Sequence, residues 1–208
     1  MARNMRIALY QPEIAGNVGA ILRLAACFAV PVDIIMPTGF AFSDARLRRA
    51  AMDYGDAAEV TRHANFEAFD AARRAQGRRL LLMSAHASQR LPDVAFHRDD
   101  VLLMGSESAG VPDSVRDLAD IRVRIPMAPG FRSLNIAVST GIAVAEALRS
   151  APGFDEARMS VVGKASNEPL IEDPQTPEEL ASNRRVEINI NQGEPIRSKP
   201  ISVLEQGQ

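Results

Sequence analysis

Short apolar segments alternate with amphipathic segments along the first 150 residues of the chain. The apolar segments have the length of buried strands, and the segments between them repeat apolar side chains every three or four residues, as helices do. We expect strands at residues 7–10, 32–36, 57–60, 79–83, 101–104 and 121–125, and longer helices at 17–29, 66–75 and 133–149. Strands that alternate with helices predict an α/β fold with a mostly parallel sheet and helices on both of its faces.

The pattern breaks at the Ala-Pro-Gly sequence of residues 151–153. The following residues are rich in Asn, Glu, Pro and Gln, with a helix candidate at 177–183, a strand candidate at 185–190 and an end from 191 that looks disordered. Residues 1–150 contain 18 arginines, no lysine and 16 acidic residues, whereas residues 151–208 contain 6 basic and 10 acidic residues. We therefore predict one domain over 1–150 and an acidic, partly disordered tail over 151–208.

The overall composition narrows the class of protein. With 46% hydrophobic residues the chain is able to form a core, yet its apolar segments are too short to cross a membrane. The N-terminal residues lack the long apolar region of a secretory signal, and the single cysteine, Cys27, excludes an intrachain disulfide and a multi-cysteine zinc site. These features favour a cytoplasmic protein.

Three loops that join a predicted strand to a predicted helix contain the candidate chemistry. The first, 11–23, places two glycines three residues apart before a helix and includes Arg23, which is as easily a surface arginine. The second, 102–112, has the glycine spacing of a phosphate-binding loop but lacks its lysine, so hydrolysis of nucleoside triphosphates is disfavoured. The third, 125–135, ends with Ser133 and Asn135, either of which is able to cap the last helix. Taken singly, each loop is explained by an ordinary turn or cap.

Taken together and in order, these segments resemble the SPOUT-class RNA methyltransferases. The resemblance covers about residues 5–150, and although each motif is weak evidence by itself, the ordered set is specific. The motifs are the sequence LYQPEI at 9–14 with Asn17 and Arg23, then residues 39–42, 46–50, 53–54, 105–112, 124–127 and 132–135.

The resemblance implies a fold, a cofactor and a substrate. The fold would be a deep trefoil knot, in which the C-terminal part of the domain threads through a loop of the chain, and the protein would be a homodimer whose sites are completed by the partner subunit. The methyl donor would be S-adenosyl-L-methionine, and the acceptor would be the ribose 2′-hydroxyl of the wobble pyrimidine of tRNA, most closely of leucine tRNAs. By position, the donor would contact Met83, Gly105, Ile125 and Ser133, and the catalytic group would comprise Arg23, Glu107, Asn17 and Asn135.

Arg23 aligns with an arginine to which the family assigns activation of the hydroxyl. Because a guanidinium stays protonated at neutral pH, we expect Arg23 to hold a phosphate or to stabilise oxyanion charge, with Glu107 orienting it. In the last helix, Ala145 stands where some relatives carry a tyrosine, so the resemblance leaves the general base, the tRNA and the nucleobase open.

Arginines near aromatic residues suggest an RNA contact. Arg46, Arg48 and Arg49 share a short predicted helix after the Phe-Ala-Phe sequence of residues 40–42, which suits phosphates and stacked bases, although a solvated helix face is the alternative. The three histidines follow no metal-ligand spacing, so we expect no metal, and we expect neither DNA nor a membrane as a partner.

The tail resembles part of an unrelated family. Residues 158–164 and 177–188 are similar to the closing part of an OmpA-like peptidoglycan-binding domain, whose remainder is absent. Two alternatives to a tRNA methyltransferase follow: a catalytically silent RNA-binding protein on the same fold, and a cell-wall-binding module. The retained site residues argue against the first, and the missing part of the OmpA-like domain argues against the second.

Overall fold

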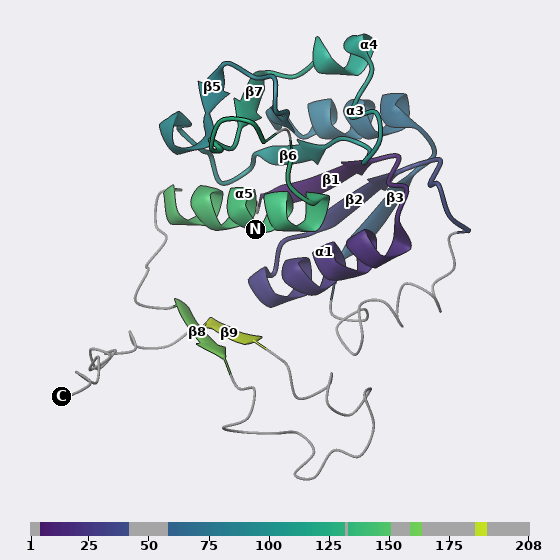
Figure 1. The fold of residues 1–208 in the computed structure, drawn as a ribbon. Coiled ribbons are helices and arrows are strands. Elements are labelled where there is room, and N and C mark those ends of the chain that lie inside the picture. The colour runs from purple at the N-terminus through teal and green to yellow at the C-terminus, as the bar shows by residue number, and fades with distance from the viewer. Residues whose placement is uncertain (1–4, 42–57, 132, 151–158, 164–185, 191–208) are drawn as a thin grey trace, which may run out of the picture. The chain divides into compact units, whose positions relative to one another are not determined.

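The computed structural model describes residues 5–41, 58–131, 133–150, 159–163 and 186–190 (Figure 1). Its contacts divide the chain into two compact units, Met1–Phe154 and Asp155–Gln208, close to the boundary that the change in composition predicts. No helix in the described part of the chain is long and apolar enough to cross a membrane.

A seven-stranded sheet forms the centre of the first unit, and all of its paired strands run parallel (Figure 1). The strand order is β3-β2-β1-β6-β4-β7-β5. The strands are β1 (Arg6–Tyr10), β2 (Val32–Ile35), β3 (Val60–His63), β4 (Leu80–Met83), β5 (Gln89–Arg90), β6 (Val101–Met104) and β7 (Ile121–Arg124). The central strands are buried on both faces, which explains their continuous apolar runs. The predicted α/β class is confirmed, and the sheet is parallel throughout.

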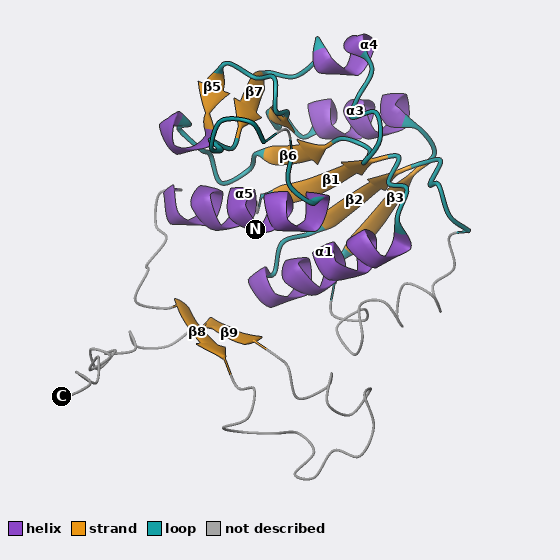
Figure 2. Ribbon diagram, in the orientation of Figure 1, coloured by secondary structure: helices purple, strands orange, loops and turns teal. Residues whose placement is uncertain are grey.

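Helices cover both faces of this sheet (Figure 2). The helices are α1 (Ala15–Phe28), α3 (Phe66–Ala75), the 3-10 helix η2 (Leu91–Asp93), α4 (Asp113–Arg116) and α5 (Ile136–Ser150). The core that contains α1, α5 and η2 includes Ile7 and Leu102, and the core that contains α3 and α4 includes Ala8 and Leu103. Because successive residues of a strand point to opposite faces, each strand contributes to both cores.

Several short elements differ from the sequence prediction. The strand expected at 57–60 begins at Val60 and is an edge strand with mostly exposed side chains, so its apolar pattern is weak. Strand β5 has two residues and helix α4 has four, which is too short for a periodic signal. The arginine-rich helix expected after residue 43 lies outside the described residues.

A buried polar cluster holds the edge strand β3 in place. The carboxylate of Asp33, which is 4% exposed, accepts hydrogen bonds from Nε and Nη2 of Arg6 at 2.6 and 3.0 Å and lies 2.8 Å from Nε2 of His63. Burial by itself would lower the pKa of the Arg6 guanidinium, but the hydrogen bonds and charge of Asp33 outweigh burial and raise that pKa. The polar composition of β3 therefore follows from the buried carboxylate that it faces.

The second unit contains an antiparallel pair, β8 (Met159–Gly163) and β9 (Val186–Ile190), with Val161 opposite Ile188. The predicted strand at 185–190 corresponds to β9. The helix expected at 177–183 and the end from residue 191 lie outside the described residues.

Candidate active site

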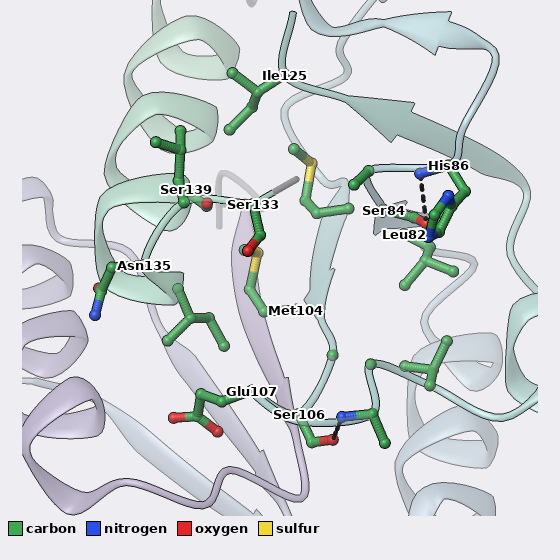
Figure 3. Close-up of a pocket in the computed structure, with 18 of the residues that line it drawn as sticks. Leu82, Ser84, His86, Met104, Ser106, Glu107, Ile125, Ser133, Asn135 and Ser139 are labelled. Carbon is green, nitrogen blue, oxygen red and sulfur yellow. Dashed lines mark hydrogen bonds between the residues drawn. The ribbon is translucent and has the colours of Figure 1, made fainter. Parts of the chain in front are cut away.

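A pocket of about 720 Å³ opens where β4, β6 and β7 end (Figure 3). In parallel sheets the loops at the carboxyl ends of the strands meet at one edge, which is where α/β folds bind ligands. The lining combines apolar side chains such as Met104 and Ile125 with polar ones. In Figure 3 Glu107 and Asn135 lie on one side, and Ser84 and His86 on the other. The volume is in the range of a small-molecule or cofactor site.

Glu107, in the turn after β6, holds the beginning of helix α1. Its carboxylate accepts hydrogen bonds from the backbone N–H of Glu13 at 2.8 Å and of Ile14 at 3.3 Å, and from Nδ2 of Asn17 at 3.0 Å. Ile14 occupies the N-cap position of α1 without a side-chain cap of its own. A carboxylate from a distant loop thus binds amides at the positive end of the helix dipole.

Glu13 completes a reciprocal clamp between the two loops. Its carboxylate accepts a hydrogen bond from the backbone N–H of Ser108 at 2.9 Å and another from the Ser108 hydroxyl at 2.6 Å. Each loop therefore provides a carboxylate for a backbone N–H of the other loop. Hydrogen bonds to charged acceptors are stronger than neutral ones, so the two loops are fixed together.

Asn17 extends this contact to the last helix. Its Oδ1 accepts a hydrogen bond from Nδ2 of Asn135 at 3.0 Å, and Oδ1 of Asn135 accepts one from the N–H of Ala137 at 2.8 Å. Asn135 is therefore the cap of α5, and a chain of polar contacts runs from Glu107 through Asn17 to the start of that helix. We call this chain the Glu107–Asn17–Asn135 relay. It joins the first and third of the predicted loops to the second.

The turn between β6 and α4 requires glycine at two positions. Ser106 and Gly110 exchange backbone hydrogen bonds at 2.9 and 3.0 Å, and Gly110 has a φ of +68°. A Cβ at Gly105 would lie 2.7 Å from Cα of Gly110, so only glycine permits this close backbone approach. The glycine spacing seen in the sequence therefore serves a compact turn at the floor of the pocket.

The model of the SpoU rRNA Methylase family matches residues 4–145. This chain belongs to that family.

Individual relatives of this SpoU methylase are similar over between 57% and 97% of their own length. A protein of Beijerinckia indica named tRNA (cytidine(34)-2′-O)-methyltransferase is 52% identical over 143 residues, which is 69% of this chain and 89% of the relative. A solved structure described as giving insights into the 2-OH methylation of C/U34 on tRNA superposes with a TM-score of 0.68 at 37% identity, covering 72% of this chain and 97% of the other. The structure of an AdoMet-bound rRNA methyltransferase from Sinorhizobium meliloti superposes with a TM-score of 0.65 at 32% identity, covering 72% of this chain and 57% of the other.

Most of the residues predicted for the site of this SpoU methylase lie around the one pocket described above. The lining includes the four residues expected to contact the donor and three of the four expected to be catalytic: Met83, Gly105, Ile125, Ser133, Glu107, Asn17 and Asn135. Arg23 lies on α1, partly buried, and is not among the lining residues. In the described residues the hydrogen bonds of Glu107 go to Asn17 and to the backbone just before α1, and the orientation of Arg23 by Glu107 stays a prediction. The catalytic roles stay predictions.

The structure corrects the predicted start of α1 and decides between the two predicted caps of α5. Helix α1 begins at Ala15 rather than at Asn17, and the Asn17 side chain contacts Glu107 and Asn135 instead of capping the helix. Of the two candidates for capping α5, Asn135 makes the contact, whereas Ser133 is exposed at the pocket. Arg46, Arg48 and Arg49 lie outside the described residues.

Sequence reasoning missed several residues that line the pocket. Ser84 and His86 follow β4 and line the pocket, as does Ser139 on α5. Glu13 lies within the recognised first motif, but nothing in the linear pattern pairs it with Ser108. These residues have no periodic signal, and only the meeting of loops at the sheet edge brings them together.

One group of potential metal ligands occurs in the described residues, away from the pocket lining. Potential ligand atoms of His97, Asp99 and Asp100 lie within 4.8 Å of one another. The carboxylate of Asp100, however, accepts hydrogen bonds from Nε and Nη2 of Arg79, both at 2.8 Å, and from the N–H of His97 at 2.7 Å. These contacts explain the group structurally, and the expected absence of a metal stays a prediction.

The reciprocal clamp predicts a local effect of Glu13. Glu13→Ala removes both acceptors of Ser108, and because a hydrogen bond to a charged group contributes about 1.5–3 kcal/mol, amide exchange at residues 106–110 should accelerate about tenfold or more. Ser108→Ala, which keeps the bond from the backbone N–H, should give a smaller increase. Hydrogen-exchange mass spectrometry checks both, with Glu67→Ala on the exposed first turn of α3 as the control. Unchanged exchange in Glu13→Ala would show that the turn does not depend on the clamp.

Proposed function

We propose that this protein transfers the methyl group of S-adenosyl-L-methionine to the ribose 2′-hydroxyl of the wobble pyrimidine, nucleotide 34, of tRNA. The observation that carries the proposal is the 52% identity to a tRNA (cytidine(34)-2′-O)-methyltransferase over nearly the whole relative. The pocket supports it, since it brings the residues of all three predicted loops together at one sheet edge. Leucine tRNAs are the substrates that we propose within this class.

The residues of the pocket fit the donor. Apolar side chains from β4, β6 and β7, among them Met83, Met104 and Ile125, offer contact area for the adenine, and the backbone of the Gly105–Gly110 turn offers polar atoms. Ser133 and Ser139 add hydroxyl groups on the opposite wall. When bound, the donor supplies an electrophilic methyl group on a positively charged sulfonium, and the carboxylate of Glu107 makes the wall near α1 negative.

The protein's other task is to orient the ribose and to stabilise the oxygen as its proton leaves. Placement in line with the methyl group lowers the barrier by fixing the geometry in advance. We assign contact with the phosphate or the developing oxyanion to Arg23, because a guanidinium is a permanent cation and not a proton acceptor. Asn17 and Asn135 keep the start of both pocket helices in place through the relay.

An assay on purified tRNA tests the proposed function. The full chain should bind S-adenosyl-L-methionine without added metal and should methylate unmodified leucine tRNA, and nuclease digestion with mass spectrometry of the nucleosides locates the modification. Arg23→Ala should nearly abolish turnover, by at least about a hundredfold, while donor affinity in calorimetry stays unchanged. Donor binding without methylation of any tRNA would favour the silent RNA-binding protein, and absence of donor binding would refute the proposal.

We propose in addition that the pocket loops form the trefoil knot implied by the SPOUT resemblance. Family membership and the meeting of the loops after β4, β6 and β7 support the knot. A knot that tightens when the chain is pulled from its ends shortens the extended chain. Force spectroscopy should therefore give a smaller contour-length gain than the number of unfolded residues requires, and the full gain would exclude a knot.

We propose that the enzyme is a homodimer through the apolar faces of α1 and α5. Leu134, Val138 and Ile142, spaced four residues apart, are 42%, 52% and 39% exposed, and Ile14 at the start of α1 is 51% exposed. Large exposed apolar side chains that form a stripe on one helix face mark an interaction surface. The same stripe borders the pocket, since Ile14 and Leu134 line it, so a partner subunit on this surface would complete the site and would bring its Arg23 there.

Subunit complementation tests this arrangement. Arg23→Ala and Gly105→Val should each be inactive alone, the second because a side chain at Gly105 collides with Gly110. If the site combines Arg23 of one subunit with the donor pocket of the other, a mixed dimer has one intact site, and equal mixing should restore about a quarter of wild-type activity. Lack of recovery in a mixture that light scattering shows to be exchanged and dimeric would place both residues in the same subunit's site, and a monomer at micromolar concentration would refute the dimer.

We propose that catalysis belongs to the first unit and takes place in the cytoplasm, where tRNA is the substrate. The family model ends at residue 145, and the Beijerinckia relative matches 69% of this chain, so the tail, with its resemblance to an OmpA-like fragment, lies outside the shared part. A chain truncated after Ser150 should retain its activity, and loss of activity would show that the tail is integral.

A further inference from the structure

Four arginines form a continuous row beside the pocket, which we call the arginine row: Arg116, Arg122, Arg124 and Arg90. Arg122 and Arg124 alternate with the core residues Ile121 and Val123 along β7. Because side chains alternate along a strand, Arg122 and Arg124 lie on the same face of the sheet. On this face Leu82, the β4 partner of Arg122, packs against α3 and α4. The sequence Ile-Arg-Val-Arg thus separates a core side from a basic side.

The register of the sheet extends this row in both directions. Arg90 on the edge strand β5 is the Cα partner of Arg124, so the two side chains leave the sheet on the same face. In the other direction, Arg122 and Arg116 both lie near one carboxylate, that of Asp117, at 3.9 and 4.0 Å. The row therefore runs from helix α4 to the edge of the sheet.

The arginines of the row are weakly neutralised, and all are at least partly accessible, with Arg124 of intermediate exposure. The side chains of Arg90, Arg116 and Arg122 are 53%, 42% and 51% exposed. Arg90 lies 3.8 Å from Asp93, which is 58% exposed, and the 2.6 Å pair of Arg116 with Asp113 is also open to water. Within the described residues Arg124 has no ion pair. Exposed pairs of this kind are weak and screened by salt, so a phosphate is able to compete for the guanidinium groups.

The row begins at the pocket. Arg116 is itself a lining residue, and Ile125, which follows Arg124, also lines the pocket. A nucleotide whose ribose enters the pocket is linked on both sides to further phosphates, and these must leave the pocket over the surrounding surface. Guanidinium groups bind phosphates through paired hydrogen bonds and hold the backbone without reading its sequence.

We infer that the arginine row is a binding surface for the phosphate backbone of the tRNA next to the methylated nucleotide. The inference rests on the proposed function, since the ligand is the substrate of that reaction. The row contains none of Arg46, Arg48 and Arg49, for which the sequence predicts an RNA contact. The inference assigns a binding role to the alternating arginines of β7.

The test compares two triple variants of the full-length protein. Arg90→Gln, Arg122→Gln and Arg124→Gln together remove three charges from the row and leave Arg116, which lines the pocket. The control, Arg62→Gln, Arg74→Gln and Arg98→Gln together, removes the same number of charges from β3, from α3 and from the loop before β6. Filter binding with an unmodified leucine tRNA transcript is measured over a range of salt concentrations, and donor affinity is measured by calorimetry.

The row variant should bind the transcript roughly tenfold or more weakly than wild type at about 0.1 M salt, with a slope of log affinity against log salt that is smaller by about 2. Its donor affinity should be unchanged, and the control variant should lose clearly less tRNA affinity. Equal losses in both variants would mean that only net charge matters, and a loss of donor affinity would mean that the arginines support the pocket; either result overturns the inference. Both leave the proposed function standing if wild type methylates tRNA, whereas failure of wild type to bind or methylate tRNA refutes the function itself.

Discussion

The carboxylate of Glu107 is the contact on which the site depends, because it holds the backbone that leads into helix α1. Ile14 has no side chain that is able to cap the helix, and the backbone N–H groups of Glu13 and Ile14, just before the helix, need an acceptor. A residue 93 positions later in the chain provides the acceptor. The start of the first helix and the turn after β6 therefore stabilise each other, and both line the pocket.

The remaining polar contacts of the site follow from this one. Once Glu107 fixes the start of α1, Glu13 is placed to bind Ser108, and Asn17 is placed to receive Asn135. Asn135 in turn caps α5, the helix that carries the exposed apolar stripe. No single element contains the site, since strands from both halves of the sheet contribute loops and each loop supplies a hydrogen-bond partner for another.

This arrangement explains how much of the molecule is predictable from its sequence. The strand Val101–Met104 is a continuous apolar run and the helix Phe66–Ala75 is amphipathic, and the predicted bounds of both agree with the structure. Resemblance to a family located the pocket residues, but not their partners. The start of α1 was misplaced because Asn17 is a good cap in isolation, and the local sequence contains no sign of a competing carboxylate. Strand β5 and helix α4 were not predicted, because they are too short to show a repeating pattern of apolar residues.

The alternation along β7 has a consequence for folding as well as for binding. A shift of this strand by one residue against β4 would turn Arg122 and Arg124 toward the core and would expose Ile121 and Val123 to water. Burying two guanidinium groups without partners is far more costly than the apolar contacts that would be lost. The arginines thus disfavour misaligned strand pairings during folding. A sequence with neutral side chains at these two positions would lose this constraint on the alignment of β7, the strand that ends at the candidate active site.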